Sequence, residues 1–319
     1  MDHQGYTFFI GDIALDEYYS AAYFPNLRDK VIVHTLPAQM GGMIANAASV
    51  YASYLQPTKF LSALNNGFIS QQLCENLRDA GIDTTYIIRD DTLPDSKTII
   101  ILAEKEHTVF IPTMGIQRLE ITPETLEAIC NAEYIYSNFC ELKPLCCGDL
   151  DAAGILSKAK ANGSRIWCDL DVADLQPGED QLFAYVDTLF VNETGFNNLM
   201  RNKTEEETKQ ILFQKGIQMI VVTYAEKGCQ IFTAHNEFIV KGINVPITDV
   251  TGAGDTFCSS FLFAYRRTEN IQLSAEFANF AAARAVTIMG GRAGACGTEA
   301  VFQFIKEHSE DFARFGNLK

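Results

Sequence analysis

Asp255 is the residue of this chain best placed to do chemistry, because it follows the small-residue turn Gly252-Ala253-Gly254. Apolar residues recur after it with helical spacing, so the turn is predicted to lie where a helix begins. Unpaired N–H groups and the helix dipole attract anions to such an end, and glycine lets a phosphate approach the backbone closely. A carboxylate there is a poor phosphate ligand but a suitable base for a hydroxyl group that attacks the phosphate.

A simpler explanation also exists, in which Thr251 caps the helix and the dipole favours an acid in its first turn. The wider stretch from Asp249 to Tyr265, DVTGAGDTFCSSFLFAY, resembles the C-terminal signature of the ribokinase-like (PfkB) family of sugar and nucleoside kinases. The resemblance implies that the turn is an anion hole and that Asp255 is the catalytic base.

A second stretch, residues 41–48 with the sequence GGMIANAA, places paired glycines before an alanine-rich helix. Such glycines allow backbone to approach a ligand, and Asn46 offers both a donor and an acceptor, although tight helix–sheet packing would explain the glycines equally well. The octet resembles the family's G-G-x-x-A-N-x-A signature, which implies that Gly42 and Asn46 contact the sugar. Asp16, after the first predicted strand, matches the family's substrate-binding aspartate, whereas Asp12 has no such match.

The nucleotide side of the family pattern is matched at positions scattered over the second half of the chain. The resemblance implies that ATP is the phosphoryl donor and that four residues bind it: Asn192, Thr223, Gly228 and Asn279. The loop after Thr223 resembles the family's V-T-x-G-x-x-G loop, with Ala225 in place of its first glycine.

The sequence matches the family's metal-binding motifs less completely than its sugar and nucleotide motifs. The family's N-x-x-E motif holds the water shell of magnesium, but Gly195 stands where the glutamate belongs. Either the neighbouring Glu193 reaches the shell, or ATP itself holds most of the Mg²⁺. We expect the second, because a shift of two positions usually points a side chain elsewhere. Asp249 and the glycine-rich loop 290–295 match a monovalent-cation site, which implies stimulation by K⁺.

The elements that must position these residues alternate regularly. Strands are predicted over 134–137, 165–169, 188–191 and 219–223, with helices over 123–130 and 150–161. This rhythm indicates a parallel sheet with right-handed crossovers and ligands at the carboxyl ends of its strands. Further predictions are a strand over 238–247, a helix over 277–289 and short strands over 31–36, 98–102 and 107–111.

The family resemblance turns this pattern into a fold prediction. We expect an α/β, ribokinase-like, doubly wound and mostly parallel sheet flanked by helices, with a small β-sheet lid. A single kinase domain over 1–319 would carry lid segments near 13–40 and 96–112, with a homodimer through the lid as one possibility.

Composition limits the partners. The chain has 319 residues, 47% of them hydrophobic, and a net charge of −15, which repels nucleic acid and anionic membranes. Its nine cysteines are odd in number and form no C-x-x-C pair, as expected of reduced thiols in a cytoplasmic protein. The sequence has no signal-peptide pattern and no 18-residue apolar span, so secretion and membrane insertion are not expected.

The function that these residues predict is transfer of the ATP γ-phosphoryl group to a hydroxyl group of a sugar or sugar acid. A nucleoside (adenosine-like) kinase of the same fold is the alternative substrate class. A ligand-binding paralogue with reduced turnover would instead fit Gly195, Ala225 and the Asn65-Asn66 loop, which departs from the family pattern. Asp171 replaces a family asparagine, and its added negative charge disfavours an anionic substrate.

Overall fold

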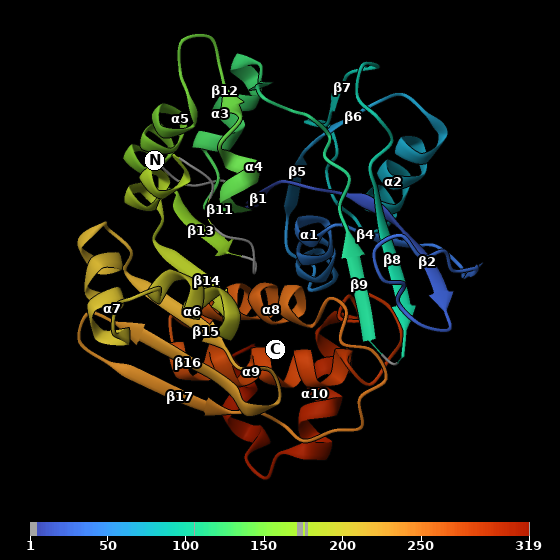
Figure 1. Cartoon of the computed structure of the whole chain (residues 1–319). Coiled ribbons are helices and arrows are strands. Elements are labelled where there is room, and N and C mark those ends of the chain that lie inside the picture. Colours follow the sequence, from blue (N-terminus) through green and yellow to red (C-terminus); the bar gives the residue numbers. More distant parts are fainter. Residues whose placement is uncertain (1–4, 105, 171–174, 176–177, 319) are drawn as a thin grey trace.

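The centre of the structure is an eight-stranded sheet (Figure 1). Its strands lie in the order β17 (Glu237–Lys241), β16 (Gly228–Thr233), β15 (Met219–Thr223), β14 (Thr188–Asn192), β13 (Arg165–Leu170), β11 (Tyr134–Asn138), β1 (Thr7–Ile10) and β5 (Thr58–Leu61). Neighbours from β5 to β15 are parallel, whereas β16 and β17 add at one edge as antiparallel strands. The computed structural model describes residues 5–104, 106–170, 175 and 178–318. The carboxyl ends of the parallel strands meet at one edge of the sheet, where open α/β sheets bind ligands.

Helices cover both faces of this sheet (Figure 1). One core is shared with α1 (Met43–Ser53), α2 (Phe68–Asp79), α8 (Ala253–Thr268), α9 (Ile271–Ala285), α10 (Gly297–His308) and the 3₁₀ helix η3 (Phe312–Leu318). The other core is shared with α3 (Pro123–Cys130), α4 (Phe139–Leu142), α5 (Ala152–Ala161), η1 (Glu179–Tyr185), α6 (Glu193–Met200) and α7 (Glu205–Gln214). Within β1, Phe9 enters the first core while Phe8 and Ile10 enter the second. A strand buried on both faces needs apolar residues throughout, which explains the unbroken apolar runs of the sequence.

The predicted elements agree best where a cap or turn marks their ends. α3 spans the predicted residues 123–130, with the Thr122 side chain accepting a hydrogen bond from the Thr125 N–H at its start. The predicted 219–223 strand is β15. The helix predicted over 277–289 begins earlier, at Ile271, because Asn270 caps it there, and it ends at Ala285. The strand predicted over 31–36 shortens to the exposed β3 (Val33–Thr35).

The strand predicted over 238–247 was too long, because β17 ends at Lys241. At the next position, a Cβ atom on Gly242 would come within 2.1 Å of the carbonyl oxygen of Glu226. The chain packs backbone against backbone at this point and then leaves the sheet. Residues 242–252 form a loop rather than a strand, and this loop lines a cavity at the start of α8.

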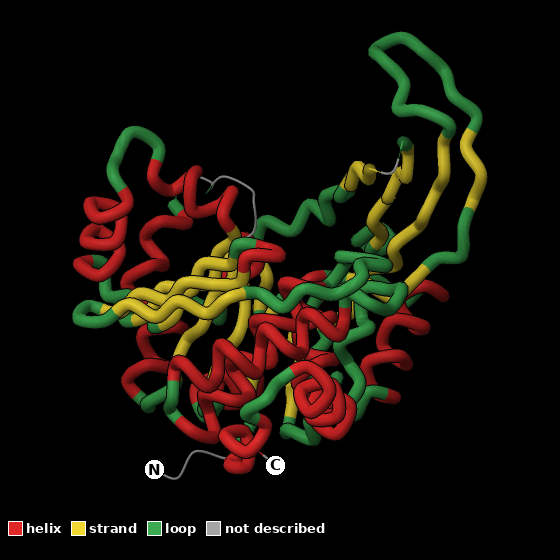
Figure 2. Tube along the Cα trace, turned by 90° about the horizontal axis from the view of Figure 1, so that it is seen from below, coloured by secondary structure: helices red, strands yellow, loops and turns green. Residues whose placement is uncertain are grey.

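A second sheet, here called the lid sheet, has the order β3-β2-β8-β9, with β2 (Ala14–Ala21), β8 (Lys97–Ala103) and β9 (Glu106–Phe110), and β4 (Gln39–Gly41) also pairs with β2. β2 and β8 run parallel and the other pairs are antiparallel. Figure 2 shows these strands at the upper right, standing away from the helices. Two short pairs lie elsewhere: β6 (Ala63–Leu64) with β7 (Ile88–Arg89), and β10 (Leu119–Glu120) with β12 (Leu145–Cys146).

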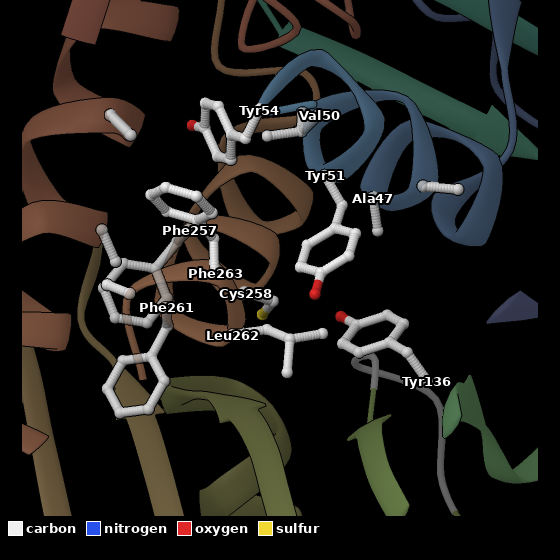
Figure 3. Close-up of a cluster of buried hydrophobic side chains, with 14 of the residues drawn as sticks. Ala47, Val50, Tyr51, Tyr54, Tyr136, Phe257, Cys258, Phe261, Leu262 and Phe263 are labelled. Atoms are coloured by element: carbon white, nitrogen blue, oxygen red, sulfur yellow. The ribbon is translucent and has the colours of Figure 1, made fainter. Parts of the chain in front are cut away.

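The contact between α1 and α8 brings the two sequence signatures together. Figure 3 shows Tyr54, the residue after α1, beside Phe257 and Phe263 of α8, and the ring centroids of Tyr54 and Phe263 lie 4.8 Å apart. The hydroxyl of Ser259 donates to the carbonyl oxygen of Ala47 at 2.6 Å, and the Tyr54 hydroxyl lies 2.7 Å from that of Ser260. Because these contacts are buried, they hold the middle of α1 and the residue after its end against the middle of α8.

The nine cysteines are free thiols, and six of them are buried: Cys74, Cys130, Cys146, Cys168, Cys229 and Cys258. Their packing as small apolar side chains matches the absence of a sequence pattern for disulfides or zinc. Among the residues that the model describes, no helix is both long enough and apolar enough to cross a membrane.

Candidate active site

The turn that starts α8 is built around Gly252, which has a φ of 73° and is the residue that precedes the helix. A Cβ atom there would come within 1.8 Å of the Gly291 carbonyl oxygen, so only glycine fits. No side chain caps this helix end, and Thr251 therefore does not play the capping role that the simpler explanation gave it. Gly254 is different, since a Cβ atom there would meet no protein atom within 4 Å.

Asp255 lies in the first turn of α8 and is bonded to the other signature. The Asn46 side chain donates a hydrogen bond from Nδ2 to Asp255 Oδ2 at 2.9 Å, across 209 positions of sequence. Asn46 is buried in α1, with 5% of its surface exposed. The predicted base and one predicted sugar ligand are therefore direct neighbours.

Asp12, which follows β1, and Asp16, which lies in β2, take different roles. Asp16 is buried, and burial, with a smaller contribution from Asp12, raises the pKa of its carboxyl to about 6. Its carboxylate lies so close to Gly41 that a Cβ atom there would come within 2.0 Å of Oδ2. Asp12 accepts hydrogen bonds from the N–H groups of Met43 and Ile44, both at 2.9 Å, and so caps α1.

Gly42, predicted to contact the sugar, is also required by packing. Its φ is 92°, and a Cβ atom would come within 2.7 Å of the Ile13 Cα atom. The tight helix–sheet contact left open as an alternative is therefore present.

Two residues of this region were not predicted from the sequence. Glu141 follows β11, and burial together with the Asp12 carboxylate raises its pKa to about 8. The rule that ligands gather beyond strand carboxyl ends could have found it. Arg292 lies in the glycine-rich loop and donates from Nε to Asn46 Oδ1 at 3.1 Å. The loop was noticed for its glycines, so its one charged side chain was passed over.

A cavity of about 510 Å³ opens beside the turn and brings the four predicted nucleotide ligands together. Asn192, Thr223, Gly228 and Asn279 all line it, as do Ala253 and Gly254 of the turn. Apolar side chains of the 242–252 loop, of α9 and of the residue after α9 form much of the remaining wall, including Ile243, Val245, Ile247, Val250, Ala282 and Val286. An apolar slot that ends at a helix N-terminus suits a flat base joined to phosphates.

Several residues that line this cavity also have structural roles. Asn279 donates from Nδ2 to the carbonyl oxygen of Lys241 at 3.2 Å, which ties α9 to the end of β17. A Cβ atom on Gly228, whose φ is 103°, would come within 2.0 Å of the Val240 carbonyl oxygen. Ala225, which replaces a family glycine, has a φ of 48° and so occupies a backbone region that favours glycine.

Glu193 and Gly195 lie on different sides of the turn that starts α6. Glu193 lines the nucleotide cavity, half-exposed, with its carboxylate 3.8 Å from the Lys227 ammonium. Gly195 is buried and lines a separate cavity of about 360 Å³. The Asn192 side chain accepts a hydrogen bond from the Gly195 N–H at 2.8 Å, so it caps the helix from within the cavity wall.

Asp249 clamps the loop that precedes the turn. Its carboxylate accepts hydrogen bonds from the N–H groups of Thr251 and Gly290, each at 2.9 Å. Burial opposes ionisation, but these hydrogen bonds outweigh it and lower the pKa of Asp249. No three His, Cys, Asp or Glu side chains among the described positions converge as a metal site. Asp171 lies outside the described residues.

Fold and site together define an α/β kinase in which a nucleotide cavity ends at a helix N-terminus beside a carboxylate. The chain matches the model of the pfkB family carbohydrate kinases over residues 9–296. It belongs to this family and to its class of ATP-dependent carbohydrate kinases.

Individual relatives agree with this assignment. The chain is 25% identical over 313 residues to a ribokinase of Haemophilus influenzae, covering 94% of this chain and 98% of that one. It is similar in fold to the Arabidopsis thaliana ribokinase complexed with ribose and ATP, with a TM-score of 0.80, 20% identity and 95% and 99% of the two chains covered. A fructokinase with bound ATP from Xylella fastidiosa gives a TM-score of 0.76, 19% identity and coverage of 95% and 99%.

Proposed function

We propose that this kinase transfers the γ-phosphoryl group of ATP to a hydroxyl group of a neutral sugar, with Asp255 as the general base. The observation that carries the proposal is the position of Asp255 in the first turn of α8, between Asn46 and the end of the nucleotide cavity at Gly254. A base must lie where acceptor and donor meet, and this position supports Asp255 in that role.

The residues around Asp255 would stabilise the transferred phosphoryl group and bind the two substrates. Backbone N–H groups of Gly252 to Asp255 would stabilise the charge that develops on the transferred phosphoryl group. Asp16, Asn46 and the Gly42 backbone would orient the sugar so that one hydroxyl faces the base. Asn192, Thr223, Gly228 and Asn279 would hold the nucleotide in its cavity.

Magnesium would neutralise the triphosphate, as in phosphoryl transfer generally. Of the two routes considered from the sequence, the geometry favours Glu193 over Mg²⁺ held mainly by ATP. Glu193 lines the nucleotide cavity, whereas a Cβ atom on Gly195 would come within 2.8 Å of Val191 Cγ2 and 3.4 Å of the Leu170 carbonyl oxygen. Gly195 lines a different cavity, so these contacts support Glu193 as the carboxylate of this turn that would hold the magnesium shell.

A monovalent cation, K⁺ in the first place, would bind by the loop that Asp249 clamps. The carboxylate already accepts two backbone N–H groups, which hold the 249–251 and 290 segments together. A cation held by carbonyl oxygens here would stiffen the turn around Gly252 without touching the substrate.

The electrostatics of the acceptor side favour a neutral sugar over a sugar acid. The carboxylates of Asp16, Asp12 and Asp255 all act electrostatically on the guanidinium of Arg292, so negative groups outnumber this cation. The guanidinium donors are also engaged by protein oxygens, as detailed below. A carboxylate on the substrate would meet net repulsion here.

A nucleoside acceptor would need an aromatic or apolar face for its base. The aromatic candidates of the lid do not supply an obvious one: Tyr18 is buried, while Tyr23 and Phe24 are exposed on the lid and Phe24 stacks on Phe110 with ring centroids 6.5 Å apart. This favours a monosaccharide. The ligand-binding alternative is opposed by the complete turn and base, which a protein that only binds would not need.

The experiment that tests the proposal measures ADP release by the purified protein with neutral sugars, sugar acids and nucleosides. Magnesium is kept in excess, and parallel runs use sodium, potassium or tetramethylammonium salts. Sugar-dependent ADP release, highest in potassium, is expected. Preference for a sugar acid would refute the electrostatic argument, and tight acceptor binding without ADP release would establish the binding protein instead.

We also propose a homodimer through the lid. Its outer strands β3 and β9 each pair on one side, and apolar side chains are exposed along them and beside them, including Ile32 at 85% and Ile111 at 75%. An open strand edge with exposed apolar residues is a liability unless a partner covers it. A second copy of the lid would cover both features.

A further inference from the structure

Arg292 joins four segments of the chain at the acceptor side of the site. Its Nε donates to Asn46 Oδ1 at 3.1 Å and its Nη2 donates to the Gly41 carbonyl oxygen at 3.1 Å. Its Nη1 donates to the Asn76 Oδ1 atom of α2. Gly41, which ends β4 and is here called the lid root, is thus tied together with α1 and α2 through one planar guanidinium to the loop that follows α9.

The hydrogen bond to Asn46 fixes which way the amide of that side chain points. A guanidinium has donors only and an ionised carboxylate has acceptors only. Asn46 stands between the two, with Oδ1 toward Arg292 and Nδ2 toward Asp255, at 3.1 and 2.9 Å. Reversal of the amide would set its donor against the guanidinium and its acceptor against the carboxylate. The chemistry of the three groups therefore permits one orientation.

The guanidinium keeps its charge in this place. Burial lowers the pKa of Arg292 to about 10, and the carboxylates of Asp16, Asp12 and Asp255 oppose that shift. A group with this pKa stays protonated at neutral pH. The donor that orients Asn46 is therefore present throughout the range in which a kinase would work.

We propose that Arg292 is a positioning residue, which holds the Asn46 amide in the orientation that aligns Asp255 with the acceptor hydroxyl. The role rests on the proposed function, because Asp255 acts as base only in that reaction. Without the guanidinium, the Asn46 amide can rotate, and the Asp255 carboxylate loses a fixed donor. Misplacement of a reacting group by about 1 Å can cost 10²-fold in rate.

The alternative is that Arg292 only stabilises the glycine-rich loop. Arg284 provides a matched control, because it donates from Nη1 to the Ala293 carbonyl oxygen at 3.3 Å and so holds the same loop. This hydrogen bond does not involve Asn46. A loop-stabilising role predicts similar losses for the two arginines, whereas a positioning role predicts a large loss for Arg292 alone.

The experiment compares steady-state kinetics of Arg292→Gln, Arg292→Lys, Arg284→Gln, Asn46→Ala and the Arg292→Gln/Asn46→Ala double variant. Arg292→Gln should lower kcat by about 10- to 100-fold while the KM for ATP changes less than about 3-fold. Arg284→Gln should keep kcat within about 3-fold of the wild type. The double variant should be no slower than Asn46→Ala by more than about 3-fold, because Arg292 acts through Asn46.

Arg292→Lys separates position from charge, since lysine keeps the charge but not the planar fork. Its kcat should stay well below that of the wild type. Full activity of Arg292→Lys, additive losses in the double variant, or equal losses in Arg284→Gln would each overturn the proposal.

A measurement independent of turnover distinguishes this proposal from the function on which it rests. In protein labelled with ¹⁵N-asparagine, the side-chain amide signals of Asn46 should shift in Arg292→Gln and stay in place in Arg284→Gln. Unshifted Asn46 signals in Arg292→Gln overturn the positioning role. An inactive wild type refutes the phosphotransferase proposal, while the signals still decide whether Arg292 orients Asn46.

Discussion

Gly252 lies directly against the carbonyl oxygen of Gly291, so a Cβ atom on Gly252 would come within 1.8 Å of that oxygen. Packing within the protein therefore requires glycine at this position of the predicted anion turn. Two positions later the reverse holds, because a Cβ atom on Gly254 would meet no protein atom within 4 Å, and Gly254 lines the nucleotide cavity. One glycine serves the fold, and the other leaves space that a phosphate would use.

This contrast predicts opposite behaviour for two alanine variants. Gly252→Ala should destabilise the protein by about 2 kcal/mol or more, because strain at positive φ adds to the clash. Gly254→Ala should leave stability unchanged or raise it by up to about 1 kcal/mol, since alanine favours helix, yet it should weaken ATP binding or turnover at least 10-fold. Urea denaturation and ADP-release assays on both variants check this. A fully active Gly254→Ala would contradict the phosphate position.

Asp255→Asn tests the base. Loss of a general base costs about 10²–10⁴ in rate, so kcat should fall by that factor. ATP and acceptor binding should stay within a few-fold, because asparagine keeps the size of the side chain and can still bond to Asn46. Isothermal calorimetry beside ADP-release kinetics separates the two effects. Near-normal kcat in this variant would remove Asp255 from the mechanism.

Asp16 should make stability depend on pH. Because burial raises its folded-state pKa from 3.8 to about 6, its favourable contribution is complete below pH 4 and is lost as pH rises through 6. Asp16→Asn removes this titration and should be more stable than the wild type by about 2 kcal/mol at pH 8, with the difference fading near pH 4. Urea melts at both pH values measure it. The same variant should bind acceptor far more weakly than the wild type while binding ATP normally.

Magnesium dependence tests the turn at Asn192. Glu193→Ala should raise the Mg²⁺ concentration for half-maximal rate several-fold, because Glu193 lines the nucleotide cavity. Glu226→Ala is the matched control, since Glu226 lines the same cavity outside the turn. Gly195→Glu should not lower the requirement and should cost about 1–3 kcal/mol of stability by overpacking against Val191. A lower Mg²⁺ requirement in Gly195→Glu would restore the route in which ATP holds most of the metal.

The lid dimer can be tested by mass in solution. Phe110→Glu and Ile111→Lys place charge on apolar side chains exposed at 46% and 75% on or beside β9. Both should convert a dimer to a monomer in size-exclusion chromatography with light scattering. Ile239→Lys is the control, because Ile239 is also exposed, at 65%, but lies on β17 outside the lid. A monomeric wild type would disprove the dimer.

The predictions agree with the structure where the interactions join residues that are close in the sequence, and they fail where the interacting residues are far apart in it. The start of α3 was predictable because Thr122 and Pro123 act on their own neighbours. The 238–247 strand was overextended because its end depends on a contact between Gly242 and Glu226, which no local pattern records. Arg292 was missed for the same reason, since its partners lie on α1, on α2 and at the lid root.

The sequence by itself determined the alternation of strands and helices, the small-residue turn before Asp255 and the residue types offered to sugar and nucleotide, because spacing and side-chain chemistry are local properties. Tertiary structure alone decided which of these groups meet. It placed Asn46 against Asp255 across 209 positions, assigned Asp12 to a helix cap, and directed Glu193 rather than position 195 toward the nucleotide cavity. Such contacts arise when helices pack on the two faces of one sheet, and packing over long sequence separation leaves no periodic trace in the chain.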